Sequence, residues 1–174
     1  VVIDPRRTAS CDGADLHLAL APGSDVALFN GLLTEIERRG LTDPAFIDHI
    51  EGAQAAFAAA RGDDLSVTGL HATERDAFFD MWCRTGRVVT IYSQGVNQSS
   101  SGSDKVNAII NCHLATGRVG RVGMGPFSVT GQPNAMGGRE VGGLANMLAC
   151  HLDIENPEHR AAVGGFWGTN ALPD

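Results

Sequence analysis

The sequence predicts an α/β fold in which helices flank a mostly parallel sheet. Short apolar segments rich in β-branched residues, at 1–4 and 87–92, alternate with longer segments whose apolar residues recur at helical spacing. A polar, glycine-rich loop at 93–102 follows one of these strands, and such loops present ligands in parallel sheets. We expect one domain over residues 1–174, because this length suits a single core.

The elements are expected in the following order. Residues 1–4 form an apolar strand that Pro5 ends, and 15–20 alternate polar and apolar residues as a second strand does. A helix begins at Ser24, its expected N-cap, and ends near Gly40, where a C-terminal cap is expected. The segment 87–92 is the third strand, and further helices are expected at 43–60, 73–83, 103–116, from near Val141 and from Pro157.

Composition and charge argue against several classes of protein. Hydrophobic residues at 43% and charged residues at 19% are typical of a globular chain. The formal net charge of −7 argues against nucleic-acid binding, and no apolar segment approaches the length of a membrane span. The four cysteines are widely spaced without a C-x-x-C pair, so we expect buried, reduced thiols of a cytoplasmic protein and no metal site. Because Val1 already belongs to an apolar strand, we expect the chain to be part of a longer protein.

Residues 130–143 are the most distinctive segment of the chain. They combine five glycines with Gln132, Asn134, Arg139 and Glu140, and they show no strand or helix periodicity before Val141. Glycine allows close approach of the backbone to a ligand, and the polar side chains supply directed hydrogen bonds. We interpret the segment as a ligand cradle; the alternative is a plain surface loop.

Other candidate binding residues follow the predicted strands. Asp4 and Arg6 come directly after the first strand, Asp25 begins a helix, and Asn97 and Gln98 follow the strand at 87–92. A carboxylate after such a strand can accept hydrogen bonds from ribose hydroxyls or from guanine. The alternatives are a capped turn with solvated arginines, an ordinary helix start and an Asn/Gln turn. No catalytic triad, P-loop or G-x-G-x-x-G pattern is present.

The segment TGQPNAMGGREVGG at 130–143, together with 95–129, resembles the cofactor-binding region of the molybdopterin oxidoreductases. The resemblance extends to 1–8, 18–33 and 152–168, and within the family it is strongest to bacterial assimilatory nitrate reductases. It implies a Rossmann-like three-layer domain that lacks its first strand. It also implies molybdenum bis(molybdopterin guanine dinucleotide) as cofactor and a [4Fe–4S] cluster in a preceding part of the protein.

The resemblance also implies roles for individual residues. Asp4, Arg6 and Asp25 match the segments at the guanosine end of the dinucleotide. The pterin and pyrophosphate are expected at Gln94, Asn97 and Gln98, and Gln94 occupies a position close to the metal where related nitrate reductases often have a Met. The cradle residues Gly131, Gln132 and Gly138 are expected to contact cofactor, and Gln132 and Arg139 to bind nitrate.

The implied function is that of a cytoplasmic nitrate reductase that reduces nitrate to nitrite. The expected partners are the remaining domains and an electron donor, which could be ferredoxin, flavodoxin or an NADH-dependent subunit. We expect no nucleic-acid or membrane partner, and no activity of residues 1–174 alone. The alternatives are a formate dehydrogenase or another member of the superfamily, and a non-catalytic nucleotide-binding module.

Overall fold

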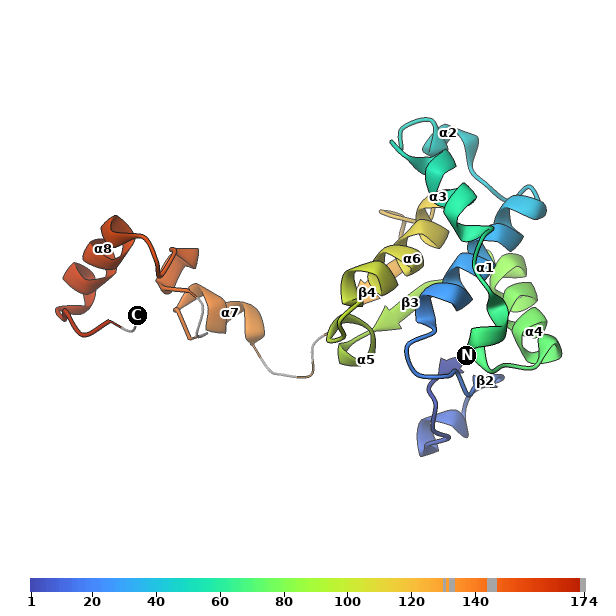
Figure 1. The fold of residues 1–174 in the computed structure, drawn as a ribbon, viewed down its shortest axis with the longest axis horizontal. Coiled ribbons are helices and arrows are strands. Elements are labelled where there is room, and N and C mark those ends of the chain that lie inside the picture. The colour runs from blue at the N-terminus through green and yellow to red at the C-terminus, as the bar shows by residue number, and fades with distance from the viewer. Residues whose placement is uncertain (130, 132–133, 144–146, 173–174) are drawn as a thin grey trace. The chain divides into compact units, whose positions relative to one another are not determined.

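The computed structural model describes residues 1–129, 131, 134–143 and 147–172. The chain divides into two compact units, Val1–Val129 and Thr130–Asp174, which are described separately below (Figure 1). The single domain expected over residues 1–174 stays a prediction.

The first unit contains two pairs of parallel strands. β1 (Val2–Ile3) pairs with β2 (His17–Leu18), and β3 (Val89–Tyr92) pairs with β4 (Gly125–Ser128). Parallel strands joined by helices confirm the predicted α/β class. The Rossmann-like arrangement and the absent first strand stay predictions, because the described strands form two separate sheets.

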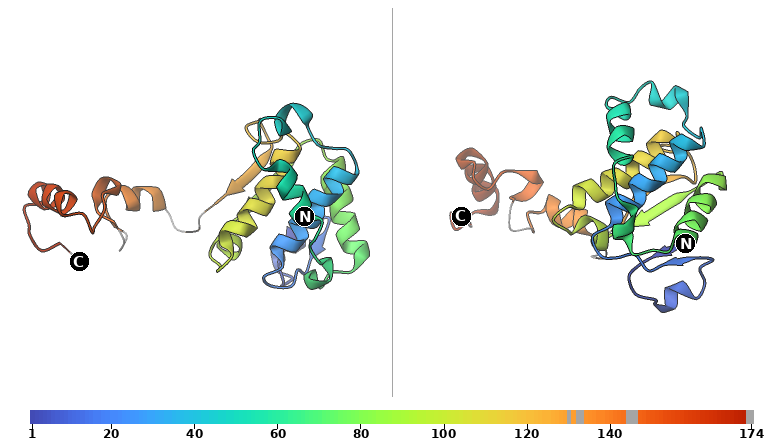
Figure 2. Two further views of the ribbon diagram at one scale, coloured as in Figure 1. Left: turned by 45° about the horizontal axis from the view of Figure 1, so that its top comes forward. Right: turned by 45° about the vertical axis from the view of Figure 1, so that its right-hand side comes forward.

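Helices connect and cover these strands. Two long helices, α1 (Asp25–Arg38) and α6 (Gly102–Ala115), lie side by side and make the most extensive packing in the unit (Figure 2). The remaining helices of the unit are α2 (Pro44–Ile47), α3 (Ala53–Ala60), α4 (Ala72–Arg84), α5 (Gln94–Asn97) and the 3₁₀ turns Ala9–Cys11 and Leu65–Thr68.

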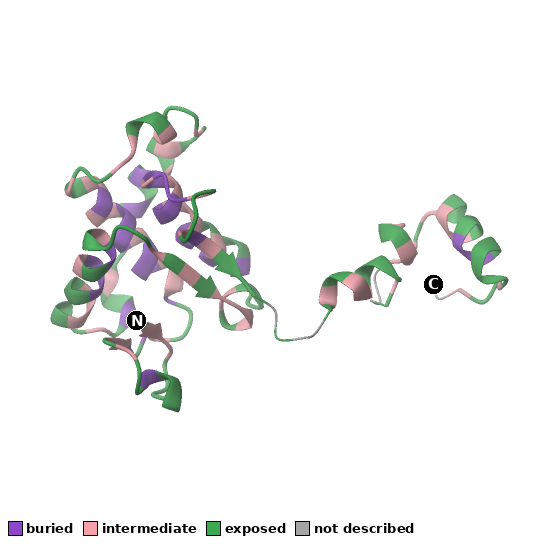
Figure 3. Ribbon diagram, turned by 180° about the vertical axis from the view of Figure 1, so that it is seen from behind, coloured by how far each residue is buried: buried purple, intermediate pink, exposed green. Residues whose placement is uncertain are grey.

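The core of the first unit is built around α1. Leu28, Leu32 and Ile36 follow one another at helical spacing, are fully buried, and belong to one apolar cluster with Ile109 of α6 and Phe78 of α4. Figure 3 shows buried residues gathered where the helices of the first unit pack together. Each such side chain contributes about 1.5–3 kcal/mol through burial of its apolar surface. These apolar residues of α1 therefore hold α6 in its position, and the N-terminus of α6 adjoins the candidate site.

Several predicted elements differ in detail. The helix expected at 43–60 is divided into α2 and α3, because Gly52 has a φ of +76°. The hydroxyl of Ser24 does not cap α1 but donates to the carbonyl of Ala21 at 2.7 Å. α4 begins at Ala72 and not at Thr73, and the His71 N–H donates to Glu74 Oε2 at 3.1 Å. β4 was not predicted, and it contains Pro126, a residue typical of edge strands and not of central ones.

The second unit contains α7 (Ala135–Glu140), the 3₁₀ turn Ala149–His151 and α8 (Pro157–Trp167). α8 was predicted from Pro157, and the Asn156 side chain accepts from the Glu158 N–H at 2.9 Å. The helix expected from near Val141 is wrong. α7 ends before that residue, and Gly142, with a φ of +72°, lies so close to Ala149 that a Cβ would approach its nitrogen to 2.6 Å. Part of the expected loop at 130–143 is therefore helical.

The cysteines follow the prediction only in part. Cys11 and Cys112 are buried, and the Cys112 thiol donates to the Phe29 carbonyl at 3.2 Å. Burial raises the pKa of both Cys83 and Cys112. Cys150, in contrast, is exposed. In the part of the chain that the structure describes, no three His, Cys, Asp or Glu residues gather as a metal site would require.

Candidate functional site

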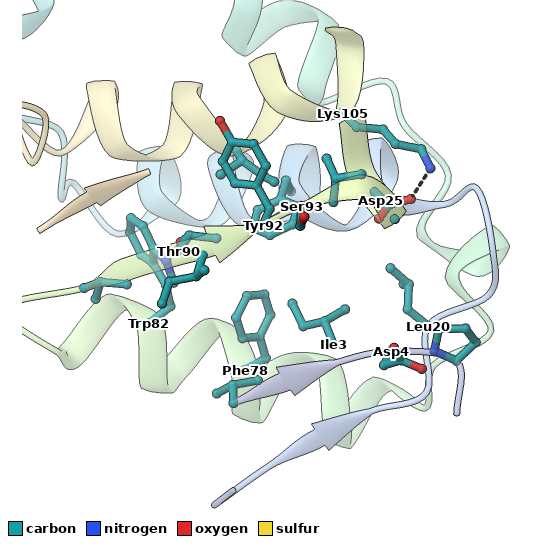
Figure 4. A pocket seen from close by; sticks show the side chains of 18 of the residues that line it. Ile3, Asp4, Leu20, Asp25, Phe78, Trp82, Thr90, Tyr92, Ser93 and Lys105 are labelled. Atoms are coloured by element: carbon teal, nitrogen blue, oxygen red, sulfur yellow. Dashed lines mark ion pairs between the residues drawn. The ribbon is translucent and has the colours of Figure 1, made fainter. Parts of the chain in front are cut away.

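The carboxyl ends of β1, β2 and β3 adjoin one cavity of about 750 Å³. Its two ends differ in chemistry (Figure 4). Polar groups stand where the strands end, contributed by Asp4, Arg6, Asp25, Ser93 and Lys105. Apolar side chains line the part between the strands, namely Ile3, Phe29, Phe78, Trp82 and Ile109. The polar end is the candidate binding site, since ligands of open parallel sheets bind beyond the carboxyl ends of the strands.

Asp4 is held at this end by its neighbours in the sheet. Its N–H donates to the Leu18 carbonyl of β2 at 3.1 Å, and its own carbonyl lies 2.9 Å from His17 Nε2. Its side-chain Oδ1 accepts from the Arg6 N–H at 2.7 Å, which closes a tight turn after β1. The turn fixes the carboxylate and leaves acceptor positions for a ligand, because a carboxylate has about four lone-pair sites.

Asp25 forms an ion pair across the same end of the cavity. It is the first residue of α1, and its Oδ2 lies 2.8 Å from Nζ of Lys105 in the first part of α6. The Lys105 side chain is only 5% exposed and that of Asp25 17% exposed, so the pair is largely removed from water. A buried ammonium group requires such a carboxylate. The pair therefore joins the two helix N-termini beside the cavity.

Lys105 is a site residue that sequence reasoning missed. A signal for it exists, because Lys105, Ile109 and Cys112 share the apolar stripe of α6 and all three are buried. A lysine on the buried stripe of a helix needs a specific partner, and here the partner lies on another helix.

The loop after β3 contains the short helix α5. Gln98 N donates to the Gln94 carbonyl at 2.9 Å, and Ser93 Oγ lies 3.5 Å from Gln94 Oε1. A Cβ on Gly102 would approach the Asn97 carbonyl to 2.4 Å, so only glycine allows α6 to begin this close to α5. Gln94 is half-buried, whereas Asn97 and Gln98 are exposed. The loop adjoins the cavity through Ser93, Gly95 and Val96.

The predicted residues of the cradle belong to the second unit. Arg139 lies in the last turn of α7, and its exposed side chain forms no ion pair with Glu140 or with any other residue that the structure describes. Gly138 is half-buried, Gly131 is exposed, and Gln132 lies outside the described residues. The structure thus brings Asp4, Arg6 and Asp25 together at the cavity, next to the loop of Gln94, Asn97 and Gln98.

Arg118 packs against the Trp82 side chain of α4. It is buried, with Cζ 4.0 Å from the Trp82 ring centre, and its Nη2 donates to the Thr85 carbonyl at 2.7 Å. His113 stacks edge-on against the same Trp82 and shares a hydrogen bond of 2.7 Å with Thr90 Oγ1 of β3. Burial, and secondarily the charge of Arg118, lowers the pKa of His113 to about 4. His113 thereby joins α6 to β3, and both His113 and Arg118 pack against Trp82 of α4.

Comparison with known proteins identifies the family. Residues 1–167 match the molybdopterin oxidoreductase family model, and the chain belongs to that family. This membership confirms the resemblance seen in the sequence and implies a molybdenum–pterin cofactor.

The relatives include nitrate reductases over nearly the whole chain. A nitrate reductase of Klebsiella oxytoca is 53% identical over 99% of this chain and 20% of its own length. The assimilatory nitrate reductase catalytic subunit of Bacillus subtilis is 32% identical over 97% of this chain and 24% of its own. Acetylene hydratase from Pelobacter acetylenicus shares the fold over 70% of this chain and 18% of its own, with a TM-score of 0.64 and 23% identity. The chain therefore spans only about a fifth to a quarter of these nitrate reductases.

None of the helices in the described ranges combines the length and apolar character that crossing a membrane requires.

Proposed function

We propose that this chain is a cofactor-binding part of a molybdenum-dependent nitrate reductase that reduces nitrate to nitrite. The observation that carries the proposal is the convergence of Asp4, Arg6, Asp25 and Lys105 at the carboxyl end of a parallel sheet, in a chain of the molybdopterin oxidoreductase family. The relatives' names support nitrate as the substrate. When bound, the molybdenum centre supplies the two-electron chemistry, while the protein binds, orients and excludes water.

The donor set at the polar end fits the guanosine half of molybdopterin guanine dinucleotide. Guanine presents N1–H and an exocyclic amine, both donors, and the fixed Asp4 carboxylate is an acceptor that can take them. Asp25 has one oxygen engaged by Lys105, which leaves its other oxygen to accept from the ligand. The buried ammonium group of Lys105 and the Arg6 guanidinium, which also line the cavity, supply positive charge for the pyrophosphate.

The loop of α5 is proposed to contact the pyrophosphate and pterin. Gln94 is anchored by its backbone carbonyl, and Asn97 and Gln98 expose side chains that both donate and accept. The close contact between Gly102 and Asn97 keeps this loop in place against α6. By the resemblance, the Gln94 carboxamide is proposed to lie near the metal.

The substrate is proposed to bind to Arg139 together with Gln132. Nitrate is planar and anionic, and an exposed guanidinium free of the neighbouring Glu140 offers it two parallel donors. Gly131 and Gly138 are proposed to let the backbone approach the cofactor closely. The [4Fe–4S] cluster, the electron donor and the cytoplasmic location belong to the same proposal for the whole protein.

The test uses the full-length parent enzyme. We expect nitrate-dependent oxidation of a reduced viologen, with molybdenum present, and no formate-dependent dye reduction. Arg139→Ala is expected to lower kcat/KM for nitrate at least ~100-fold while molybdenum content stays constant, because it removes charge-assisted hydrogen bonds in the transition state. Arg139→Lys keeps the charge but loses the planar pair of donors, so it should recover only part of the activity.

A second variant separates cofactor binding from chemistry. Asp4→Asn keeps the turn after β1 but replaces one acceptor oxygen by a donor, so retention of the dinucleotide should fall. The matched control is Asp12→Asn, in an exposed pair with Arg7 outside the cavity. Formate turnover, or an enzyme without molybdenum, would refute the assignment.

A further inference from the structure

Lys105 stands against two local preferences of its own helix. It is buried in the stripe of α6 that Ile109 and Cys112 continue as apolar residues. Its N–H donates to the Ser101 carbonyl at 3.0 Å, so it completes the first turn of α6. Long side chains of a helix point back toward its N-terminus, where the helix dipole disfavours a cation. Burial and dipole therefore both act against a lysine here, and an apolar residue would fill the position at lower cost.

The partner of Lys105 accounts for this costly position. Its Nζ lies 2.8 Å from Oδ2 of Asp25, the first residue of α1. A carboxylate in the first turn of a helix is stabilised by the free N–H groups of that turn. In the described part of the chain, however, Lys105 is the polar partner of the Asp25 side chain, and no backbone N–H of α1 is. Lys105, and not the helix, therefore sets the direction of this carboxylate.

The ion pair belongs to the polar end of the cavity. Figure 4 shows Lys105 and Asp25 on one side of that end and Asp4, after β1, on the other. All three residues line the cavity. Packing of α1 on α6 is supplied by apolar residues, among them Leu32 and Ile109 of one buried cluster. The pair is thus placed to serve the site and is not needed to fill the core.

We propose that Lys105 is a positioning residue that makes the site select guanine, and that it acts through Asp25. By engaging Oδ2, it leaves Oδ1 of Asp25 in a fixed direction to accept from the exocyclic amine of the base. That amine has two N–H groups, so the Asp4 and Asp25 carboxylates can each accept one. Hypoxanthine lacks the amine and leaves both acceptors unpaired. The inference rests on the proposed guanosine subsite and adds the residue that sets its base preference.

The test measures base preference in the 174-residue chain, whose first unit has a core of its own. GMP, IMP and guanosine are titrated separately, and binding is followed by NMR at the amides of Asp4 and Asp25. The ratio of GMP to IMP affinity reports the amine, and the ratio of GMP to guanosine affinity reports the phosphate. The unmodified chain should prefer GMP to IMP at least ~10-fold, and Lys105→Met should lower this preference at least ~3-fold.

Two further variants separate positioning from direct contact with phosphate. Arg6→Gln removes a cation that lines the cavity without pairing with Asp25, and its backbone N–H can still donate to Asp4 Oδ1. This variant should lower the preference for GMP over guanosine and keep the preference for GMP over IMP. Lys105→Arg keeps a cation for Asp25 and should recover part of the base preference.

A double-mutant cycle shows whether Lys105 acts through Asp25. Asp25→Asn should lower the preference for GMP over IMP, and adding Lys105→Met should lower it no further, because the carboxylate that Lys105 positions is already gone. The double variant leaves no buried charge unpaired, so this comparison keeps the test available if Lys105→Met alone does not fold.

The outcomes distinguish this inference from the proposed function. If the unmodified chain does not bind GMP beside Asp4 and Asp25, the proposed guanosine subsite is refuted, and the role of Lys105 with it. GMP binding with an unchanged base preference in Lys105→Met would refute the role of Lys105 and leave the subsite. A fall in the GMP-to-guanosine ratio alone would make Lys105 a phosphate ligand, and additive effects in the cycle would show that it acts apart from Asp25.

Discussion

The two compact units differ in how much of their apolar surface they bury by themselves. In the first unit, Leu28, Leu32 and Ile36 of α1 have no measurable exposure. In the described part of the second unit, the buried residues are Leu148, Val163 and Gly164, while Phe166 is 87% and Met136 76% exposed. The first unit therefore has a core of its own. The second carries apolar side chains that suit contacts beyond it, since large exposed apolar groups commonly mark interaction surfaces.

The largest expected effect comes from breaking the core of the first unit. Leu32→Ala should lower the free energy of unfolding by about 3 kcal/mol, because it leaves a cavity in the α1–α6 contact. Phe166→Ala in the second unit should change it by less than about 0.5 kcal/mol. Urea unfolding followed by circular dichroism measures both. A similar loss in the two variants would show that the units share one core.

The next effect concerns the ion pair beside the cavity. Lys105→Met should destabilise the first unit by about 2 kcal/mol, because it leaves the largely buried Asp25 without its partner. Arg61→Ala removes the exposed Arg61–Glu37 pair and should cost less than about 1 kcal/mol. The double variant Asp25→Leu/Lys105→Met should regain part of the loss in the same unfolding measurement. If it regains nothing, the pair is not the source of the effect.

Acid should destabilise the first unit through His113. Its pKa falls from an ordinary 6.5 to about 4 in the folded chain, so the unfolded state binds the proton more readily between these values. The stabilising contribution of the neutral imidazole is complete above pH 6.5 and is lost as the pH falls toward 4. At pH 5 the loss in the free energy of unfolding is about 2 kcal/mol. Urea midpoints at pH 7 and pH 5 should differ less in His113→Gln than in the unmodified chain. The exposed His49→Gln is the control and should keep the full difference.

The smallest expected effect comes from replacing a positive-φ glycine at the end of a helix, a change that can be made once in each unit. Gly40 after α1 and Gly168 after α8 have φ values of +67° and +66°, and a Cβ at either meets no atom within 4 Å. Ala at either position is strained by about 1 kcal/mol. Gly40→Ala should lower global unfolding free energy by that amount, whereas Gly168→Ala should only accelerate amide exchange within α8. Equal global effects would contradict the separation of the units.

Sequence patterns predicted the elements with strong local signals. The apolar stripe of α1, the β-branched strand β3 and the start of α8 at Pro157 were all predicted, because periodicity and helix-start signals are local properties. The helix expected near Val141 failed because Gly142 turns the chain back toward Ala149, a contact that no local pattern contains. β4 was missed because Pro126 is acceptable only at the outer edge of a sheet, and that position depends on strand order.

The candidate site also combines features that the local sequence predicts with features that only the packed fold creates. The sequence by itself determined the family, the α/β class and the choice of Asp4, Arg6 and Asp25, because residue types after predicted strands and a distinctive motif are encoded along the chain. Only the tertiary structure decided that Lys105 pairs with Asp25, that Arg118 is buried against Trp82, and that residues of β1 and β3 line one cavity. The physical reason is that each of these features joins residues far apart in sequence, so it exists only after α1, α4 and α6 have packed around the strands.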